Sequence, residues 1–454
     1  MQNMNYYDVF PRMVPADKKS EIRIRPRFEH AAFPKPERLD VFAVPVDGYY
    51  PGGSHRNLGG SESTRHPLEW RLDDGVLVVN GFFAGEQEQI ITAEIAGEKD
   101  PAAKTILEFR IYSLKEDLYA VRPFKGDFHI HTTRSDGREC PAYVAARYRQ
   151  HGFDFIAISD HGKYEPSLEA INYWKGCDLD FQLYPGEEVH SPGNPVHIIN
   201  FGASCSINAL CRADEEKYRR EVRAIQSALP PMETGLDSFA VAASELVFDR
   251  IRENGGLAVF CHPYWYTTRN VICEALTSAI LRRRKFDAFE LIGGFYKHQS
   301  RSNNYQVARW TEELSRGNRF PVVGLSDSHG TSKFEEGKDK TFTDSSDRDL
   351  FDWNFTIVFS AENSLPSIAE AVRGFRSVAV CRYGGELPSL YGDFRMVKYA
   401  DFLLREYFPV QENLCEPEGS LMLARLAGDL QAETALKSLK GRTLSFREES
   451  FRKR

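Results

Sequence analysis

Two histidines separated by one residue stand at the end of an apolar run in GDFHIHTTRSDG, residues 126–137. Because successive side chains of a β-strand point to opposite faces, His129 and His131 would lie on the same side of one strand. Neutral imidazole is a common metal ligand, so the pair could hold one cation. Asp136 follows on the loop after this strand and could add an oxygen ligand.

The same kind of arrangement recurs farther along the chain. Four more histidines lie within or just after short apolar runs, and carboxylates accompany two of the strand ends. These residues are His161 in DFIAISDH, Glu188 in LYPGEEVH, His197 in VHIINFG, His262 in VFCHPYW, and Asp327 and His329 in GLSDSHG. A single histidine of this kind is usually an ordinary hydrogen-bonded residue, but the whole set predicts a metal cluster. Mixed His, Asp and Glu ligation without thiolate is typical of catalytic Zn, Mn or Fe sites.

Short apolar strands alternate with longer amphipathic segments from about residue 123 onward. This alternation predicts an α/β fold with a mostly parallel sheet or a (β/α) barrel, and the large number of strand–helix units favours the barrel. In a parallel barrel the strand C-termini converge on one face, where side chains distant in sequence meet. The predicted strands span 126–131, 154–161, 181–190, 196–202, 257–263, 288–294 and 321–330.

Two further regions flank the predicted barrel. Residues 1–122 read as an antiparallel β-rich domain, because Leu107, Phe109 and Ile111 alternate with polar residues in the period of a half-buried strand. The glycine-rich residues 47–66 are predicted to form a long surface loop. The predicted division is a β-rich domain over 1–122, a barrel over 123–385 with a helical insertion near 206–245, and a C-terminal helical tail over 386–454.

Composition narrows the class of protein. The chain has 454 residues, 42% of them hydrophobic and 27% charged, which fits a globular protein of more than one domain. Its net charge of -7 argues against duplex nucleic acid as a binding partner. Eight cysteines without a C-x-x-C pair suggest reduced thiols. With no long apolar run, we expect a cytoplasmic protein without a membrane partner.

The quoted motifs, in this order, resemble the metal sites of the polymerase and histidinol phosphatase (PHP) superfamily of metal-dependent phosphoesterases. The resemblance covers roughly residues 123–335. It implies a distorted (β/α)7 barrel of PHP type that holds two or three divalent metal ions, Zn, Mn or Fe. The family's P-G-x-E spacing selects Glu188 rather than Glu187, which a regular strand would point to the other side.

The resemblance also implies a ligand set for each ion. One metal would take His129, His131, Glu188 and Asp327, with Glu188 bridging to a second metal that His197 and His262 also hold, and a third would lie on Asp136, His161 and His329. A metal lowers the pKa of a bound water from 15.7 to about 7, so a metal-bound hydroxide is available at neutral pH. The expected reaction is hydrolysis of a small phosphorylated metabolite or nucleotide by a di- or trinuclear centre.

Other residues are assigned supporting roles. Asp160 is expected to orient a ligand or handle a proton, and His190 could protonate the leaving group. Glu290 is expected to hydrogen-bond near the cluster rather than to ligate a metal. The cations predicted to contact substrate phosphate are Arg134, Lys163, Arg269 and Lys297.

Two alternative functions stay open at this point. The protein could hydrolyse another ester or an amide, because the same hydroxide attacks carbonyl groups. It could instead be a non-catalytic metal-binding regulatory module, because a fold alone never fixes a function. The expected partner is a small-molecule phosphate ester, and the chain could form a homo-oligomer.

Overall fold

The computed structural model describes residues 6–48, 65–232, 235–266, 269–294, 300–330, 350–382 and 387–451. The chain divides into two compact units. The first comprises Met1–Arg122, Lys398–Leu414 and Gly441–Arg454, and the second comprises Pro123–Val397 and Cys415–Lys440. The segment predicted as a tail, 386–454, is therefore shared between the two units. Most of the predicted loop over 47–66 lies outside the described residues.

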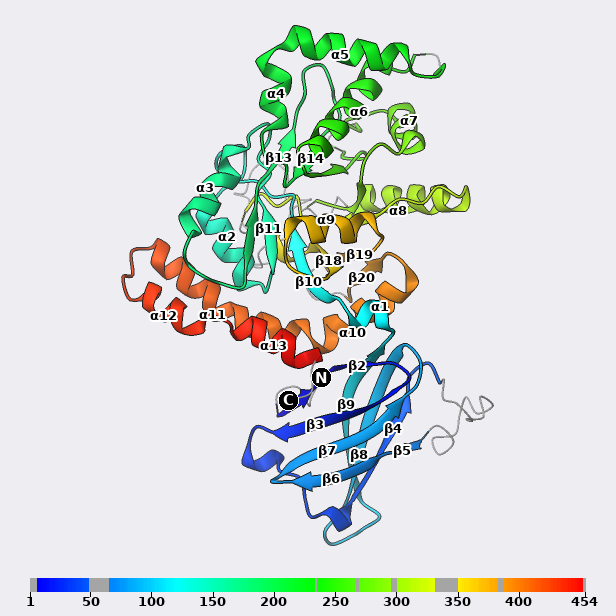
Figure 1. The fold of residues 1–454 in the computed structure, drawn as a ribbon, viewed down its shortest axis with the longest axis vertical. Coiled ribbons are helices and arrows are strands. Elements are labelled where there is room, and N and C mark those ends of the chain that lie inside the picture. The colour runs from blue at the N-terminus through cyan, green and yellow to red at the C-terminus, as the bar shows by residue number, and fades with distance from the viewer. Residues whose placement is uncertain are drawn as a thin grey trace. The chain divides into compact units, whose positions relative to one another are not determined.

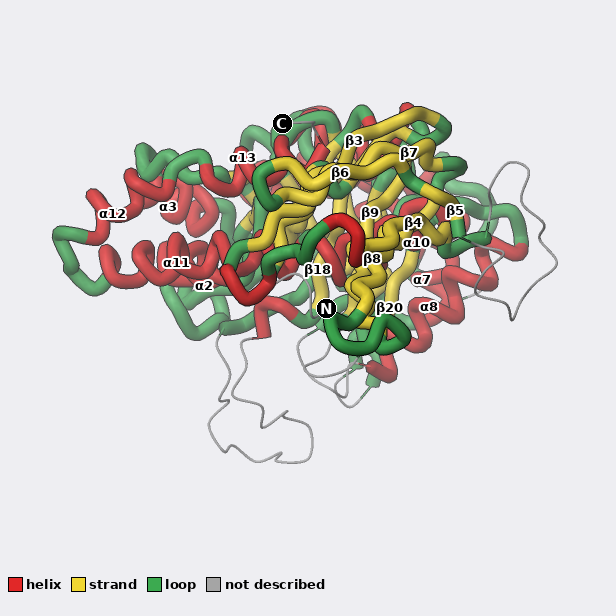
Figure 2. The backbone as a smooth tube through the Cα atoms, turned by 90° about the horizontal axis from the view of Figure 1, so that it is seen from below, coloured by secondary structure: helices red, strands yellow, loops and turns green. Residues whose placement is uncertain are grey.

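The first unit is built from two β-sheets (Figure 1). One sheet consists, in order, of β1 (Tyr7–Phe10), β3 (Lys18–Pro26), β7 (Val76–Phe83) and β6 (Glu69–Asp73), all antiparallel. The other consists of β2 (Met13–Pro15), β9 (Lys104–Leu114), β8 (Gln87–Ala96), β4 (Leu39–Pro45) and β5 (His66–Pro67), antiparallel apart from the β2–β9 pair. Figure 2 shows β3, β7 and β6 running side by side.

The apolar side chains that alternate along these strands explain how the two sheets pack together. Ile22 and Ile24 of one sheet and Ile91 and Phe109 of the other belong to a single buried cluster, so both sheets contribute to one core. The turn between β6 and β7 is the Asp74–Gly75 pair, and both residues have positive φ, at 48° and 76°. That conformation suits a tight two-residue hairpin. Strands β1, β2 and β3 were not among the predicted strands. The unit also contains the helices α1 (Glu116–Tyr119) and α13 (Arg442–Phe451) and the segment Lys398–Leu414.

The second unit is α/β and contains the predicted metal ligands. Its six-stranded sheet consists, in order, of β12 (Gln182–Tyr184), β11 (Phe155–Ala157), β10 (Arg122–Asp127), β18 (Asn354–Ser360), β19 (Ser377–Cys381) and β20 (Ser389–Tyr391). Its five-stranded sheet consists of β13 (Gly186–Val189), β14 (Ile198–Phe201), β15 (Leu257–Phe260), β16 (Ala288–Ile292) and β17 (Val322–Gly324). Strand β14 runs antiparallel to both of its neighbours, while β15, β16 and β17 are parallel.

Helices follow most of these strands, as the alternation predicts. They are α2 (Pro141–Gln150), α3 (Glu165–Trp174), α4 (Ile207–Ala213), α5 (Glu215–Ser227), α6 (Ser238–Glu253), α7 (Glu274–Arg283), α8 (Ser300–Ser315), α9 (Leu365–Arg373), α10 (Phe394–Glu406), α11 (Phe408–Leu426) and α12 (Ala432–Leu439), of which α10 and α11 cross the boundary between the units. Strands β15, β16 and β18 are buried along their whole length, and β15 has the unbroken apolar sequence that such burial favours.

The α/β class is confirmed, whereas the closed (β/α)7 barrel is not. Among the described residues the paired strands of this unit form two separate sheets. Two isolated bridges join them: Ile130–Ser328 links residues beyond β10 and β17, and His161–Glu188 links a residue beyond β11 to one within β13. The single strand predicted over 181–190 is also wrong. Pro185, which has no N–H to donate, divides it into β12 and β13, and these belong to different sheets.

The cysteines and the helices of the described residues bear on two predictions from the sequence. All eight cysteines are described and none of them forms a disulfide. Within the described residues, none of the helices combines the length and the apolar character needed to cross a bilayer.

A buried ion pair in the second unit predicts how stability depends on pH. The Nζ of Lys125 lies 2.6 Å from Asp352 Oδ1, and Arg382 contacts the other oxygen. Burial opposes the charge on Asp352, but the two cations outweigh it and lower the pKa to about 2. Because this pKa lies below its ordinary value, the stabilisation is present above pH 4 and is lost as the pH falls toward 2.

We therefore expect Asp352→Asn to cost about 2 kcal/mol at pH 7 and far less at pH 2.5. Melting temperatures of the wild type and the variant between pH 2 and 7 measure this difference. An equal gap at both ends of the range would show that ionisation of Asp352 contributes nothing.

Candidate metal centre

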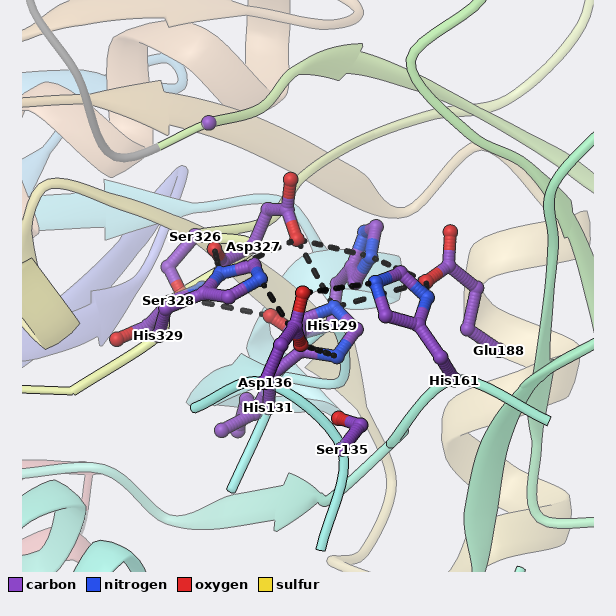
Figure 3. A network of polar contacts seen from close by, with 12 residues as sticks. His129, His131, Ser135, Asp136, His161, Glu188, Ser326, Asp327, Ser328 and His329 are labelled. Atoms are coloured by element: carbon purple, nitrogen blue, oxygen red, sulfur yellow. Dashed lines mark hydrogen bonds and ion pairs between the residues drawn. The ribbon is translucent and has the colours of Figure 1, made fainter. Parts of the chain in front are cut away.

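The predicted ligands converge because the strands of the second unit end together. His129 and His131 follow β10, His161 follows β11, and His262 follows β15. Glu188 lies in β13, and His197 reaches the same place because β14 runs antiparallel to β13 and therefore begins where β13 ends. The last two ligands, Asp327 and His329, follow β17. Figure 3 shows seven side chains of this cluster pointing toward one another, namely His129, His131, Asp136, His161, Glu188, Asp327 and His329.

Glu188 lies at the centre of the cluster and is fully buried. Its Oε1 lies 2.7 Å from His197 Nδ1 and 3.2 Å from His262 Nε2. Its Oε2 contacts His161 Nδ1 and lies 3.6 Å from His131 Nε2. The two oxygens of one carboxylate thus face two different sets of histidines, as a bridging ligand would.

Asp327, which follows β17, provides a second carboxylate beside His129 and His131. Its Oδ1 lies 3.0 Å from His131 Nε2 and 3.2 Å from His129 Nε2. Asp327 has a φ of 49°, an uncommon conformation for a residue with a side chain, and such strain is found preferentially at functional sites. Burial opposes its charge, but the neighbouring histidines lower its pKa.

A third group forms around Asp136 on the loop after β10. Its Oδ1 lies 3.3 Å from His329 Nε2, and its Oδ2 lies 3.4 Å from His161 Nε2. The Nδ1 of His329 is 2.8 Å from the carbonyl oxygen of Asp327, so as a donor it leaves Nε2 facing Asp136. With His131, one ligand atom from each of these side chains lies within 4.8 Å of the others.

The arrangement fits divalent cations. Among the described residues, several buried atoms of the cluster have no hydrogen bond of acceptable geometry, namely His129 Nε2, both ring nitrogens of His131, Glu188 Oε2 and His197 Nδ1. Leaving such atoms without partners costs about 1–3 kcal/mol each. A cation coordinated by these nitrogens and oxygens would supply the missing partners.

The protonation of the histidines in the cluster also bears on metal binding. Burial lowers the pKa of His131 to about 4, with a further contribution from His329, so this imidazole is neutral at pH 7. Burial also disfavours charge on His161, but Glu188 and Asp136 outweigh it and raise its pKa to about 10. A metal that binds His161 would have to displace its proton, so metal binding should release protons and weaken at low pH.

Glu290 in β16 orients the first histidine. Its Oε2 lies 2.7 Å from His129 Nδ1, and both side chains are fully buried. This contact leaves His129 Nε2 facing the cluster, which is the hydrogen-bonding role expected for Glu290. A Cβ on Gly293 would lie 1.9 Å from Glu290 Oε1, so the glycine makes room for the carboxylate.

We expect Glu290→Gln to lower metal affinity about tenfold and Glu290→Leu about a hundredfold, because partners that orient metal-binding histidines typically contribute this much. Titration calorimetry with Zn²⁺ measures the effect. Glu313→Gln is the matched control, because Glu313 is equally buried but hydrogen-bonds Asn318 away from the cluster. Equal affinities for all four proteins would contradict this role.

Asp160 and Glu187 are next to candidate ligands in the sequence, but their carboxylates form hydrogen bonds outside the cluster. The carboxylate of Asp160 accepts hydrogen bonds from Thr132 N and Oγ1, at 2.8 and 2.7 Å, and from Ser135 Oγ at 2.5 Å. Asp160 therefore fixes the loop that carries Asp136. Glu187 accepts hydrogen bonds at the start of α4, at 2.5 Å from Ile207 N. The choice of Glu188 over Glu187 agrees with this geometry.

His190 lies at the edge of the cluster. Its Nε2 is 2.9 Å from His161 Nδ1 and 3.7 Å from Glu188 Oε2, and its side chain is 33% exposed. With His161, Glu188 and His197 it forms a group that could hold a metal. The imidazole predicted to be an acid is thus also placed where it could be a ligand.

The predicted phosphate contacts are less well placed than the ligands. Arg134 forms a bidentate ion pair with Glu169, at 2.8 and 2.7 Å, and Lys163 Nζ contacts the carbonyl oxygen of Arg134. Arg269 is exposed. Lys297 lies outside the described residues. Among the three described cations, none has a hydrogen bond or ion pair with the residues of the metal groups.

Sequence reasoning missed a hydrogen-bonded network under the cluster. The carboxylate of Asp127 accepts from Tyr148 Oη at 2.8 Å and from the backbone N–H of His129 at 3.1 Å, and Tyr148 Oη also lies 2.8 Å from Ser326 Oγ. Burial raises the pKa of Asp127 to about 6. The network ties the end of β10 to the segment after β17. A buried Cys261 beside His262 was also missed as a candidate ligand, although it directly precedes that histidine in VFCHPYW.

Comparisons with known proteins were made for the whole chain. No family model and no curated protein matches it. Solved structures do. A two-domain protein from Bacteroides vulgatus, named as containing a PHP-like metal-dependent phosphoesterase, is 18% identical with a TM-score of 0.36, and the match covers 58% of this chain and 66% of that one. This chain therefore spans slightly less than two thirds of that protein.

Two further structures resemble the chain. One from Bifidobacterium adolescentis, named as a metal-dependent phosphoesterase, is 20% identical with a TM-score of 0.31, covering 48% of this chain and 92% of that one. One from Chromobacterium violaceum, named as an amidohydrolase, is 17% identical with a TM-score of 0.30, covering 45% and 87%. Neighbours of this chain are thus named as PHP-like metal-dependent phosphoesterases and as an amidohydrolase.

Proposed function

We propose that this chain is a metal-dependent phosphoesterase that hydrolyses a small phosphorylated metabolite or nucleotide. The observation that carries the proposal is the buried Glu188 carboxylate, which faces His131, His197 and His262 from several strand ends. Among the described residues, both ring nitrogens of His131 and Nδ1 of His197 have no hydrogen bond of acceptable geometry. The motifs that supply these residues are those that resemble the PHP superfamily.

The proposal includes a ring of seven strands. Pairing runs from β10 to β11 and from β13 through β14, β15 and β16 to β17. The Ile130–Ser328 bridge links the end of β10 to the segment after β17, and the His161–Glu188 bridge links the segment after β11 to β13. We propose that this ring acts as a distorted (β/α)7 barrel with the metal centre at one end.

Two or three divalent ions, Zn, Mn or Fe, would occupy the centre. The residues that would hold them are His129, His131, Asp136, His161, Glu188, His197, His262, Asp327 and His329. When bound, such ions neutralise phosphoryl charge and lower the pKa of water toward 7.

The chain's other residues position this centre and its substrate. Glu290 holds the His129 ring through Nδ1, and Asp160 fixes the loop of Asp136. His190, partly exposed at the edge, is the proposed donor of a proton from its ring to the leaving-group oxygen. Phosphoryl transfer needs positioning and charge stabilisation more than covalent help from the protein.

Hydrolysis of a carboxylic ester or amide is the second candidate. It is favoured by one observation, the bidentate pairing of Arg134 with Glu169. This pairing engages an arginine of the loop that carries Asp136 with a protein carboxylate. A phosphoesterase would need other cations or the metals themselves to bind the phosphate.

A substrate panel distinguishes the two candidates. The full chain, loaded with Mn²⁺ or Zn²⁺, is assayed on phosphomonoesters, phosphodiesters, carboxylic esters and amides. The proposal predicts that phosphate esters are hydrolysed with the highest kcat/KM and that His190→Ala lowers kcat most for poor leaving groups. Faster cleavage of amides or carboxylic esters would favour the second candidate.

A further inference from the structure

A buried thiol lies within the metal centre and has no role in the proposed reaction. Cys261 directly follows β15 and is 2% exposed. Its Sγ lies 3.9 Å from Glu188 Oε1. One ligand atom from each of Cys261, His129 and His262 lies within 4.8 Å of the other two. A soft sulfur donor therefore lies beside two imidazoles and a carboxylate.

The backbone explains how two consecutive residues reach the same cluster. In a regular strand the side chains of Cys261 and His262 would point to opposite faces. His262 has a φ of 25°, which breaks the strand geometry directly after β15. The Nε2 of His262 lies 3.2 Å from Glu188 Oε1, the same oxygen that Cys261 contacts. Both side chains thus approach one carboxylate oxygen.

A second, independent feature points to a cation at this position. His129 is fully buried, and Glu290 engages its Nδ1 at 2.7 Å. The remaining ring nitrogen, Nε2, has no hydrogen bond of acceptable geometry among the described residues. A buried nitrogen that faces carboxylates without a hydrogen bond of acceptable geometry, and a buried thiol beside it, form a ligand pair that a metal would satisfy.

We propose that Cys261 Sγ is a ligand of the metal ion that His129 and His262 help to hold, an inference that rests on the proposed metal-dependent function. Thiolate is a soft ligand, so a set of nitrogen, sulfur and oxygen donors selects zinc or iron over manganese or magnesium. A buried cysteine that only fills space as a small apolar side chain would make no bond to the metal.

The test uses the full chain loaded with Co²⁺. A cobalt–thiolate bond gives a charge-transfer absorption band in the near ultraviolet, which imidazole and carboxylate ligands do not give. We expect this band in the wild type, its loss in Cys261→Ser and Cys261→Ala, and its retention in Cys211→Ser. Cys211 is the matched control, because it is fully buried and contacts Arg250 rather than the cluster.

A second measurement needs no variant. X-ray absorption of the zinc-loaded wild type should show a sulfur scatterer at about 2.3 Å from the metal. Full binding of cobalt and zinc with no sulfur signal in either spectrum, or a cobalt band that persists in folded Cys261→Ser, overturns the inference and leaves the metal centre intact. A wild type that binds neither metal overturns the proposed function as well, and the measured metal content distinguishes the two failures.

Discussion

Glu188→Gln is expected to abolish hydrolysis and to remove most of the bound metal. Glutamine keeps the size of the side chain but loses the charge that faces His131, His197 and the other histidines of the cluster. Metal ions typically contribute several kcal/mol to such reactions, so we expect kcat/KM to fall by at least about 10³-fold. Metal content by mass spectrometry and hydrolysis on the same samples measure both effects.

The preceding residue offers a matched control. Glu187→Gln makes the same chemical change one position away, where the carboxylate accepts hydrogen bonds from Ser206 Oγ at 2.7 Å and from Ile207 N. We expect it to retain its metal and to lose about 1–2 kcal/mol of stability, because a buried hydrogen-bonded group is weakened. Equal metal loss in both variants would contradict the central position of Glu188.

The second large effect concerns stability. Arg149 of α2 and Glu418 of α11 form a salt bridge at 2.5 Å in which both side chains are almost fully buried. Arg149 also donates to the carbonyl oxygen of Phe153 at 3.0 Å. Glu418→Ala would leave the guanidinium charge buried without its carboxylate, and breaking such pairs costs about 3–5 kcal/mol. Chemical denaturation of the full chain measures the loss.

Two comparisons make this prediction specific. Glu416→Ala removes an exposed carboxylate from the same helix, one that accepts from Gln150 Nε2 at 3.2 Å, and should change stability by less than about 0.5 kcal/mol. The double variant Arg149→Met, Glu418→Leu removes both charges and should recover much of the loss. If Glu418→Ala is no more destabilising than Glu416→Ala, the buried pair does not stabilise the fold.

The convergence of the candidate ligands could be predicted from the sequence because strand periodicity is a strong local signal. His129 and His131 must share a face of any regular strand, and histidines at several strand ends have few explanations other than convergence. The selection of Glu188 over Glu187 depended on the family's motif spacing. The structure then places the two carboxylates on opposite sides of β13.

The remaining features depend on contacts that no local pattern encodes. The ion pair of Arg134 with Glu169 joins residues far apart in the chain, so a cation that seemed available for phosphate is engaged by another side chain. Cys261 and its neighbour His262 reach the same cluster because His262 has a positive φ, which sequence periodicity does not reveal. Strand pairing is equally non-local, and the closed barrel implied by the resemblance became two sheets joined by isolated bridges.

The most direct test of the central claim is ester hydrolysis by the full chain, purified without chelator and assayed with Mn²⁺ or Zn²⁺. It is measured as phosphate release from a phosphomonoester and as alcohol release from a phosphodiester. The double variant His129→Ala, His131→Ala is measured in parallel. We predict at least two metal ions per wild-type chain and hydrolysis that the variant lacks. Fewer than two bound metals, together with release no faster than that of the variant, would contradict the assignment.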